Sequence, residues 1–244
     1  MHRAGDYNVA YLTNPGITRK AFMASMMATQ ALYLSTNQLY CEAELLACFQ
    51  EDGQWIAVLD KTVFHPQDEG QPGDTGRILT HCGERAQVLH TRKVGDEIQH
   101  ILDHPLPTGM TTMALDKEAR QLHSCLHSLG HLIGTIGLQN GWQPIRANHW
   151  PNTCHVEFAP KTHVVELDEQ TIAQHLSRLI AAGLPVQISL DQTGTRRVGF
   201  GDLSALPCVG THISNTRELP ANIRISTRLQ QGNLQVRYHI PEAA

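Results

Sequence analysis

The stretch DKEARQLHSCLHSLGHLIGTIGLQNG, residues 116–141, decides the fold of the second half of the chain. Apolar residues recur along it at intervals of four and three, the period of one buried helix face. Asp116 is a typical N-cap residue, and the pair Asn140-Gly141 is a typical helix end. The sequence therefore predicts one long helix over about residues 116–139. The residues expected on its buried face are Leu122, Leu126, Leu129, Ile133 and Ile136.

The segment before this helix has the pattern of short strands. Apolar and polar residues alternate from about residue 38, and Asp52-Gly53 is a typical turn. Short strands at this spacing are typical of a small antiparallel barrel. Pro105, Pro107 and Gly109 indicate a linker after it. The strands are expected near residues 45–49, 55–59, 62–65, 76–82, 86–91 and 97–102.

The segment after the helix mixes helices and strands without a regular βαβ rhythm, which favours an α+β fold. A strand around 154–159, a helix around 168–182, a strand at 185–190 and a hairpin over 223–240 are expected. We therefore predict an α+β protein with three parts. They are an N-terminal extension (1–36), a β-barrel domain with a glycine-rich loop (37–110) and an α+β domain with the long helix (111–244).

Composition limits the possible functions. The chain has 244 residues, a hydrophobic fraction of 41% and a net charge of −4, which indicates an ordinary globular protein. A negative chain is not typical of proteins that wrap nucleic acid, so any RNA contact is expected to be local. The candidate basic residues for such a contact are Arg19, Lys20, Arg92, Lys93, Arg196, Arg197, Arg224, Arg228 and Arg237.

The six cysteines form no C-x-x-C pair, which in a chain of this length indicates reduced thiols and a cytoplasmic protein. No apolar stretch is long enough to cross a bilayer, and no membrane partner is expected. Residues 19–34 resemble a signal peptide only faintly, because polar residues interrupt the apolar run. A short helix or a loose extension is the alternative interpretation of that segment.

Two pairs of residues suggest a metal site. His123 and His127 lie four apart on the expected helix, so both imidazoles can reach one ion. Cys208 and His212 form a second pair, and Gly210 between them gives the backbone freedom to bring them together. Nitrogen and sulfur donors suit zinc. His131 lies about 80° round the helix from His123 and is interpreted as a core or supporting histidine.

Gly130 and Gly134 continue the stripe of the two helix histidines. A glycine inside a helix costs roughly 1 kcal/mol relative to alanine, so two on one face need a reason. The two explanations are close packing of a neighbouring element and an open pocket beside the imidazoles.

These runs resemble a known family. RQLHSCLHSLGH at 120–131 and PCVGTHISNTREL at 207–219 are similar to the H-x-x-x-H and C-G-G-T-H motifs of the alanyl-tRNA synthetase editing domain and its free-standing AlaX relatives. EGQPGDTG at 69–76 resembles the family's glycine-rich loop, and NTCHVEFAP at 152–160 occupies the place of its Arg-Phe-Asp-Phe-Ser strand. The resemblance spans about residues 38–219, with the motifs in the family's order.

The resemblance implies a trans-editing hydrolase that deacylates tRNA for alanine mischarged with serine or glycine. It implies a Zn²⁺ cofactor held by His123, His127, Cys208 and His212, and the acceptor end of tRNA(Ala) as the partner. No counterpart of the ATP-dependent synthetase core is visible, so a free-standing editing factor is expected. We expect the site in the cleft between the two domains.

The glycine-rich loop supplies the candidate catalytic residues Gln71, Asp74 and Thr75, and the candidate substrate-binding residues are Gly70, Thr211 and Thr216. Asp, Thr and Gly are also common in ordinary turns, and threonine can cap a backbone turn. The sequence departs from the family pattern at Asp68 and Glu69, which replace glycines, and at Val209. These departures leave the choice between serine and glycine open.

The alternative function is a zinc-stapled RNA-binding module without catalysis, in which metal supports the fold. A zinc protease is disfavoured because Ser124 stands where an H-E-x-x-H motif has its glutamate. A serine hydrolase is disfavoured because the chain lacks a G-x-S-x-G motif.

Overall fold

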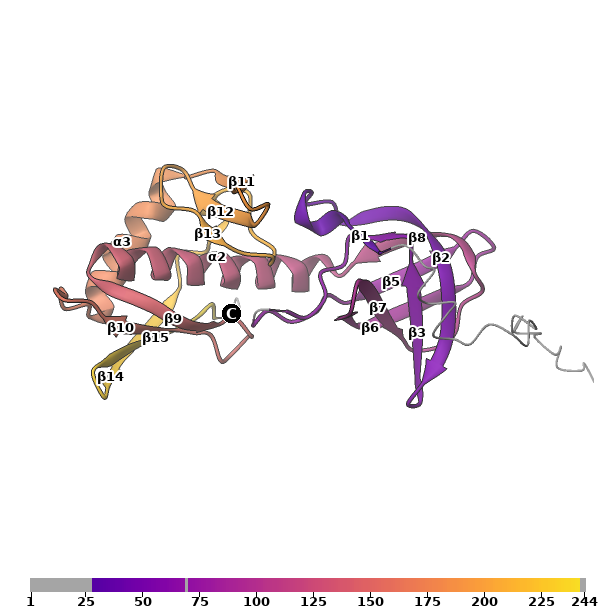
Figure 1. The fold of residues 1–244 in the computed structure, drawn as a ribbon, viewed down its shortest axis with the longest axis horizontal. Coiled ribbons are helices and arrows are strands. Elements are labelled where there is room, and N and C mark those ends of the chain that lie inside the picture. Colours follow the sequence, from indigo (N-terminus) through magenta and orange to yellow (C-terminus); the bar gives the residue numbers. More distant parts are fainter. Residues whose placement is uncertain (1–27, 69, 242–244) are drawn as a thin grey trace, which may run out of the picture.

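The computed structural model describes residues 28–68 and 70–241 (Figure 1). It shows a β-barrel on one side, an α+β half on the other, and a long helix that leads from one into the other. The interpretation of residues 19–34 lies largely outside the described residues, which begin at 28. From there the chain forms the short strand β1 (Gln30–Ala31) and the 3₁₀ helix η1 (Leu32–Leu34), and β1 pairs with β4 (Lys61–Thr62).

Six antiparallel strands close into a barrel in the order β2-β3-β7-β6-β5-β8. Closure leaves no unpaired sheet edge, and alternate residues point into the interior. Phe64, Ile78 and Met113 are fully buried in the barrel core. The strands are β2 (Tyr40–Glu51), β3 (Gln54–Leu59), β5 (Gly76–Thr80), β6 (Arg85–Val94), β7 (Glu97–Leu102) and β8 (Gly109–Leu115).

The prediction that Pro105–Gly109 forms a linker after the barrel is wrong. This segment joins β7 to β8, and β8 pairs with both β2 and β5 inside the barrel. The proline- and glycine-rich composition therefore marks a loop within the barrel. The domain boundary at residue 110 stays a prediction, although β8 runs across it.

Helix α2 (Lys117–Gln139) follows the barrel at once. The Asp116 carboxylate accepts hydrogen bonds from the backbone N–H groups of Glu118 and Ala119, which caps the helix as its sequence predicted. Four of the five expected core residues are buried, but Leu122 is 37% exposed. The core of this half begins at Cys125, so the first turns of α2 lie beyond it.

The α+β half contains a four-stranded sheet in the order β14-β15-β10-β9, which packs against α2. The hairpin of β14 and β15 turns at Gln231 and Gly232, both with positive φ, as a tight two-residue turn requires. Helix α3 (Glu169–Ala182) packs on the same hydrophobic core as this sheet and α2. The strands are β9 (Trp142–Asn148), β10 (His155–Pro160), β14 (Arg224–Gln230) and β15 (Asn233–His239).

A small sheet β11-β12-β13 covers another side of α2 (Figure 1). It consists of β11 (Val186–Leu190), β12 (Arg196–Phe200) and β13 (Leu206–Pro207), and the 3₁₀ helix η2 (Thr216–Glu218) follows. The loop from β13 to η2 carries Cys208 and His212. The α+β class and the antiparallel barrel are thus confirmed, and no helix in the described ranges has the length and apolarity to span a membrane.

Candidate metal centre

Four side chains each offer one possible metal-ligand atom, and these four atoms all lie within 4.8 Å of one another. The residues are His127, His131, Cys208 and His212. The Cys208 sulfur lies 3.3 Å from Nε2 of His127 and 3.3 Å from Nε2 of His212. Zinc bound tetrahedrally at typical lengths places sulfur and nitrogen ligands about 3.5 Å apart. The donor types and their separations therefore fit a zinc ion.

The outer nitrogens of two histidines have partners that orient the rings. His127 Nδ1 lies 2.6 Å from the Gln71 side-chain oxygen, and an amide oxygen can only accept, so Nδ1 carries the proton. Nε2 of His127 then keeps its lone pair on the side of Cys208. His212 Nδ1 lies 3.0 Å from the Ser128 hydroxyl. Such second partners fix the tautomer and direction of metal-binding histidines.

Burial keeps the cluster's imidazoles neutral. It lowers the pKa of His127 and His212 well below 6.5, and neighbouring histidines lower both further. Burial also lowers the pKa of His131 from 6.5 to about 4. Neutral imidazole is the form that binds metal ions, so the cluster is ready to bind at neutral pH.

The group differs in one member from the ligand set expected from the sequence. His127, Cys208 and His212 come together, but the fourth member is His131 and not His123. His123 lies one turn earlier on α2, and its Nδ1 is buried without a hydrogen-bond partner among the described residues. The helix offers two overlapping H-x-x-x-H pairs, and only packing against the Cys208 loop distinguishes them. Metal binding by either set stays a prediction.

Gln71 connects the barrel loop to the cluster. It is fully buried, and its side-chain oxygen accepts from the Thr211 backbone N–H (3.1 Å) as well as from His127. Its amide nitrogen donates to the Thr211 hydroxyl (2.9 Å), which also contacts Ser124 (2.9 Å). Gln71 and Thr211 therefore contact each other, and both support the segments that carry the clustered side chains.

Asp74 lies in the same loop but faces another partner. Its buried carboxylate forms an ion pair with Arg120 of α2 and accepts from the His65 backbone N–H (2.5 Å). Arg120 also donates to the Val63 carbonyl (2.7 Å). These contacts tie the loop to the first turns of α2, so this geometry favours a structural role for Asp74. The sequence interpretation did not identify Arg120.

The other candidates on the two loops differ in what they contact. Gly70 has a φ of +78°, and its carbonyl accepts from the His149 backbone N–H (3.0 Å). Thr75 contacts α2 through its carbonyl, which accepts from the Asp116 N–H (2.9 Å). The Thr216 hydroxyl donates to a carbonyl of α3 and accepts from the N–H of Leu184 (2.8 Å each). Thr216 thus joins η2 to α3. Glu69 lies outside the described residues.

A cavity of about 430 Å³ lies against the cluster. His149 forms part of its wall, with its ring stacked on that of His127 at 4.2 Å and its Nδ1 2.6 Å from the Tyr238 hydroxyl. The sequence contains no signal that distinguishes His149 from the other histidines. The lining residues are Gly70, His127, Gly130, His131, Gly134, Pro144, Ala147, His149, Val156, Leu206 and Pro207.

At two positions near this cavity, neighbouring side chains lie so close to the backbone that only glycine fits. A Cβ on Gly130 would collide with the His149 ring and the Tyr238 hydroxyl, while Gly134 faces open space apart from Pro144. Both explanations for the helix glycines therefore apply, one to each. A Cβ on Gly210 would collide with the His127 ring and crowd the Gln71 side-chain oxygen. Gly210 thus lets the Cys208 loop approach α2.

The chain is similar to curated alanine–tRNA ligases. It is 28% identical over 229 residues to that of Methanospirillum hungatei, which covers 81% of this chain and 24% of the ligase. It is 27% identical over 241 residues to that of Methanoculleus marisnigri, which covers 85% of this chain and 25% of the ligase. The chain therefore spans about a quarter of the length of these ligases. No protein-family model matches it.

A shorter relative is matched over most of its own length. The chain is 27% identical over 195 residues to the alanyl-tRNA editing protein AlaX-M of Methanosarcina barkeri, which covers 67% of this chain and 79% of that protein. The resemblance inferred from the motifs is confirmed by these relatives, and it supports an AlaX-like editing protein.

Proposed function

We propose that the protein is a trans-editing hydrolase that deacylates tRNA(Ala) mischarged with serine or glycine, and thereby maintains translation fidelity. The observation that carries the proposal is that two members of the donor cluster, His127 and His131, form one wall of the cavity. A site of this kind places bound substrate beside the ion. The similarity to alanyl-tRNA editing proteins supports tRNA(Ala) as the substrate.

In this proposal, zinc is held by His127, His131, Cys208 and His212, with His131 in place of the His123 expected from the sequence. When bound, the ion would polarise the ester carbonyl, lower the pKa of an attacking water, or hold the 3′ end of the tRNA. Four protein donors fill a tetrahedral site, whereas catalytic zinc sites usually keep one position open. The donor set therefore favours holding of the substrate.

In this proposal, the residues around the cluster position its side chains or shape the cavity. Gln71 acts as a positioning residue, because its side-chain oxygen holds the His127 ring and supports the Thr211 backbone. The stacked ring of His149 closes one side of the cavity. Gly70, Gly130 and Ala147 bring backbone close to the bound group. Small residues at these positions leave room for the small aminoacyl groups of serine and glycine.

The test is deacylation of tRNA(Ala) that carries radiolabelled serine, glycine or alanine. Loss of serine or glycine with alanine spared, and inhibition by a chelator that zinc reverses, is the expected result. The metal content of the same preparation is measured by mass spectrometry, so that the ion is identified together with the activity.

No hydrolysis of any of the three esters by folded, zinc-loaded protein would reject the enzyme. If the chelator then unfolds the protein or abolishes RNA binding, the ion is structural, and the chain is a zinc-stapled RNA-binding module.

A further inference from the structure

The four-stranded sheet has a second face that the metal site does not use. Val156, Val236 and Tyr238 point to the buried side and pack in the core with α2. Paired residues of neighbouring strands project on the same side of a sheet, and successive residues alternate between the sides. The register pairs Arg224 with His239 and Arg237 with both Ser226 and His155, so all of these project on the outer side.

The outer side is strongly basic. The adjoining row runs across all four strands of the sheet. It consists, in order, of Arg228, Gln235, Glu157 and Arg146. Glu157 is the only carboxylate in these paired rows, and it accepts from Gln235 (3.1 Å) and lies 3.6 Å from His155. The outer side carries the guanidinium groups of Arg146, Arg224, Arg228 and Arg237, and the imidazole groups of His155 and His239. We call this set the basic face.

The arginines of the basic face have no acidic partners within the described ranges. No described carboxylate lies within 4 Å of any of their four guanidinium groups. The whole chain carries a net charge of −4, so a sheet face of this composition is a local departure from the rest of the protein. Arg237 Nε donates to the Gln235 side-chain oxygen (2.9 Å), which leaves its two terminal NH₂ groups to donate elsewhere. Guanidinium groups without an acidic partner on a solvent-facing sheet are available to bind anions.

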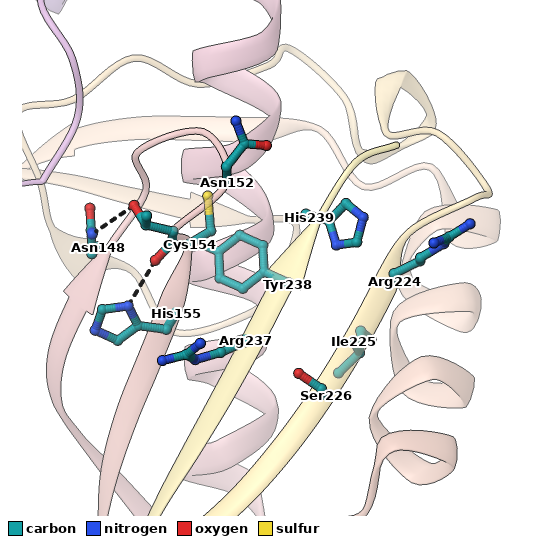
Figure 2. A pocket seen from close by; sticks show the side chains of 11 residues that line it. Asn148, Asn152, Cys154, His155, Arg224, Ile225, Ser226, Arg237, Tyr238 and His239 are labelled. Carbon is teal, nitrogen blue, oxygen red and sulfur yellow. Dashed lines mark hydrogen bonds between the residues drawn. The ribbon is translucent and has the colours of Figure 1, made fainter. Parts of the chain in front are cut away.

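A cavity of about 610 Å³ lies at one end of the basic face (Figure 2). Arg224, Arg237, His155 and His239 line it, together with the polar side chains of Asn148 and Ser226. Figure 2 shows these side chains arranged around Tyr238. A guanidinium fork matches the geometry of phosphate oxygens, and neighbouring hydroxyl and amide groups can donate to them as well.

The basic cavity adjoins the cavity of the metal cluster. Tyr238 lines the basic cavity, and its hydroxyl lies 2.6 Å from His149 Nδ1, which belongs to the wall of the other cavity. Asn148 lines the basic cavity and is followed directly by His149. The contact between Tyr238 and His149 therefore joins the walls of the two cavities. The basic cavity thus lies next to the cavity of the donor cluster.

We propose that the basic face binds the backbone phosphates of tRNA near the end that carries the amino acid. The inference rests on the proposed function, because it is the aminoacylated end that must reach the cluster. RNA backbone fits this face because the face presents guanidinium and hydrogen-bonding groups in rows, which match the repeated phosphates of a nucleic-acid chain.

The test compares two double variants of exposed arginines. Arg224→Ala/Arg237→Ala removes two guanidinium groups from the basic cavity, and Arg77→Ala/Arg85→Ala removes two from the outside of the barrel. Binding of uncharged tRNA(Ala) is measured by filter retention over a range of salt concentrations. Hydrolysis of two seryl esters, one on tRNA(Ala) and one on adenosine, which has no backbone phosphate, is measured in parallel.

The basic-face variant is expected to bind tRNA about tenfold more weakly, with a salt dependence (log K against log salt) shallower by about two. The KM for the tRNA ester rises accordingly, while the adenosine ester, which has no backbone phosphate, is hydrolysed as by the wild type. The barrel variant is expected to match the wild type in every assay. Circular dichroism and zinc content check that both variants are folded.

Equal tRNA affinity of the basic-face variant and the wild type would overturn the inference, as would equal weakening by the barrel variant. The binding assay needs no turnover, so it separates this inference from the proposed function. If the wild type hydrolyses no ester but its RNA binding still depends on Arg224 and Arg237, the hydrolase is rejected and the basic face stands.

Discussion

The barrel and the α+β half differ in how they treat buried polar groups. In the barrel, buried polar groups are spread over several strands; His100, for example, contacts the Thr62 hydroxyl (2.9 Å) and the Ala57 carbonyl (3.3 Å). In the α+β half, His127 and His131 of α2 meet Cys208 and His212 of a later loop in one cluster. The polar groups of the barrel are thus distributed, whereas the α+β half gathers possible metal donors at one place.

One loop of the barrel makes two buried side-chain contacts with the α+β half. Gln71 in this loop contacts His127, and Asp74 contacts Arg120, so both contacts end on α2. The comparison teaches that the barrel contributes to the site by positioning and supplies none of the clustered donors. Changes at the cluster should therefore leave the barrel folded, whereas changes at the junction should affect both regions.

The largest effect is expected from the cluster itself. His127→Ala removes one zinc donor and the link to Gln71, so it should lower deacylation about a thousandfold, the equivalent of several kcal/mol of lost stabilisation. His123→Ala is the matched control on the preceding turn, and it should keep the zinc content of the wild type. Metal analysis and deacylation assays measure both. Loss of zinc in the His123 variant with retention in the His127 variant would restore the ligand set expected from the sequence.

The next effect concerns the junction. Asp74→Asn leaves the buried Arg120 guanidinium without its carboxylate, so the free energy of unfolding should fall by about 3–5 kcal/mol. Urea denaturation, followed by tryptophan fluorescence and by circular dichroism, measures the loss. The double variant Asp74→Asn/Arg120→Met removes the unpaired charge and should recover part of it. An unchanged midpoint in the single variant would show that the ion pair does not couple the two regions.

A pH effect on stability is expected from His100 in the barrel. Burial lowers the pKa of His100 from 6.5 to about 4, so the folded state binds its proton less readily than the unfolded state. The contribution of His100 to stability is complete above pH 6.5 and falls towards pH 4, by about 3 kcal/mol in all. The difference between wild type and His100→Gln in urea denaturation, measured from pH 7.5 to pH 4, isolates this contribution. A difference that does not change with pH would contradict it.

The smallest effect is expected from the positioning contact. Gln71→Ala leaves all four donors in place but removes the acceptor that orients the His127 ring. Zinc affinity should fall about 10–100-fold, as is usual when the partner of a metal-binding histidine is lost. Competition with a chromogenic chelator measures the affinity. Gln71→Glu keeps an oxygen acceptor and should retain more affinity than the alanine variant; equal loss in both would reject the positioning role.

Much of the architecture could be predicted from local patterns. The N-cap at Asp116, the end of α2 near Asn140 and the hairpin around Gln231-Gly232 all lie where residue type and periodicity place them. The exposed Leu122 and the proline-rich loop inside the barrel could not be predicted in this way. Both depend on where neighbouring elements begin and end, which a local pattern does not contain.

The candidate site, too, could be predicted from the sequence only in part. The sequence by itself determined which residue types can form it: histidines four apart on a helix, a C-x-x-x-H loop, and a glycine-rich loop with Gln71. His123, His127 and His131 are equally spaced, so the helix period cannot select two of them. The tertiary structure places His127 and His131, and not His123, beside Cys208 and His212, because the Cys208 loop crosses α2 at that level. That choice depends on contacts between segments far apart in sequence, and Gly210 permits the close approach.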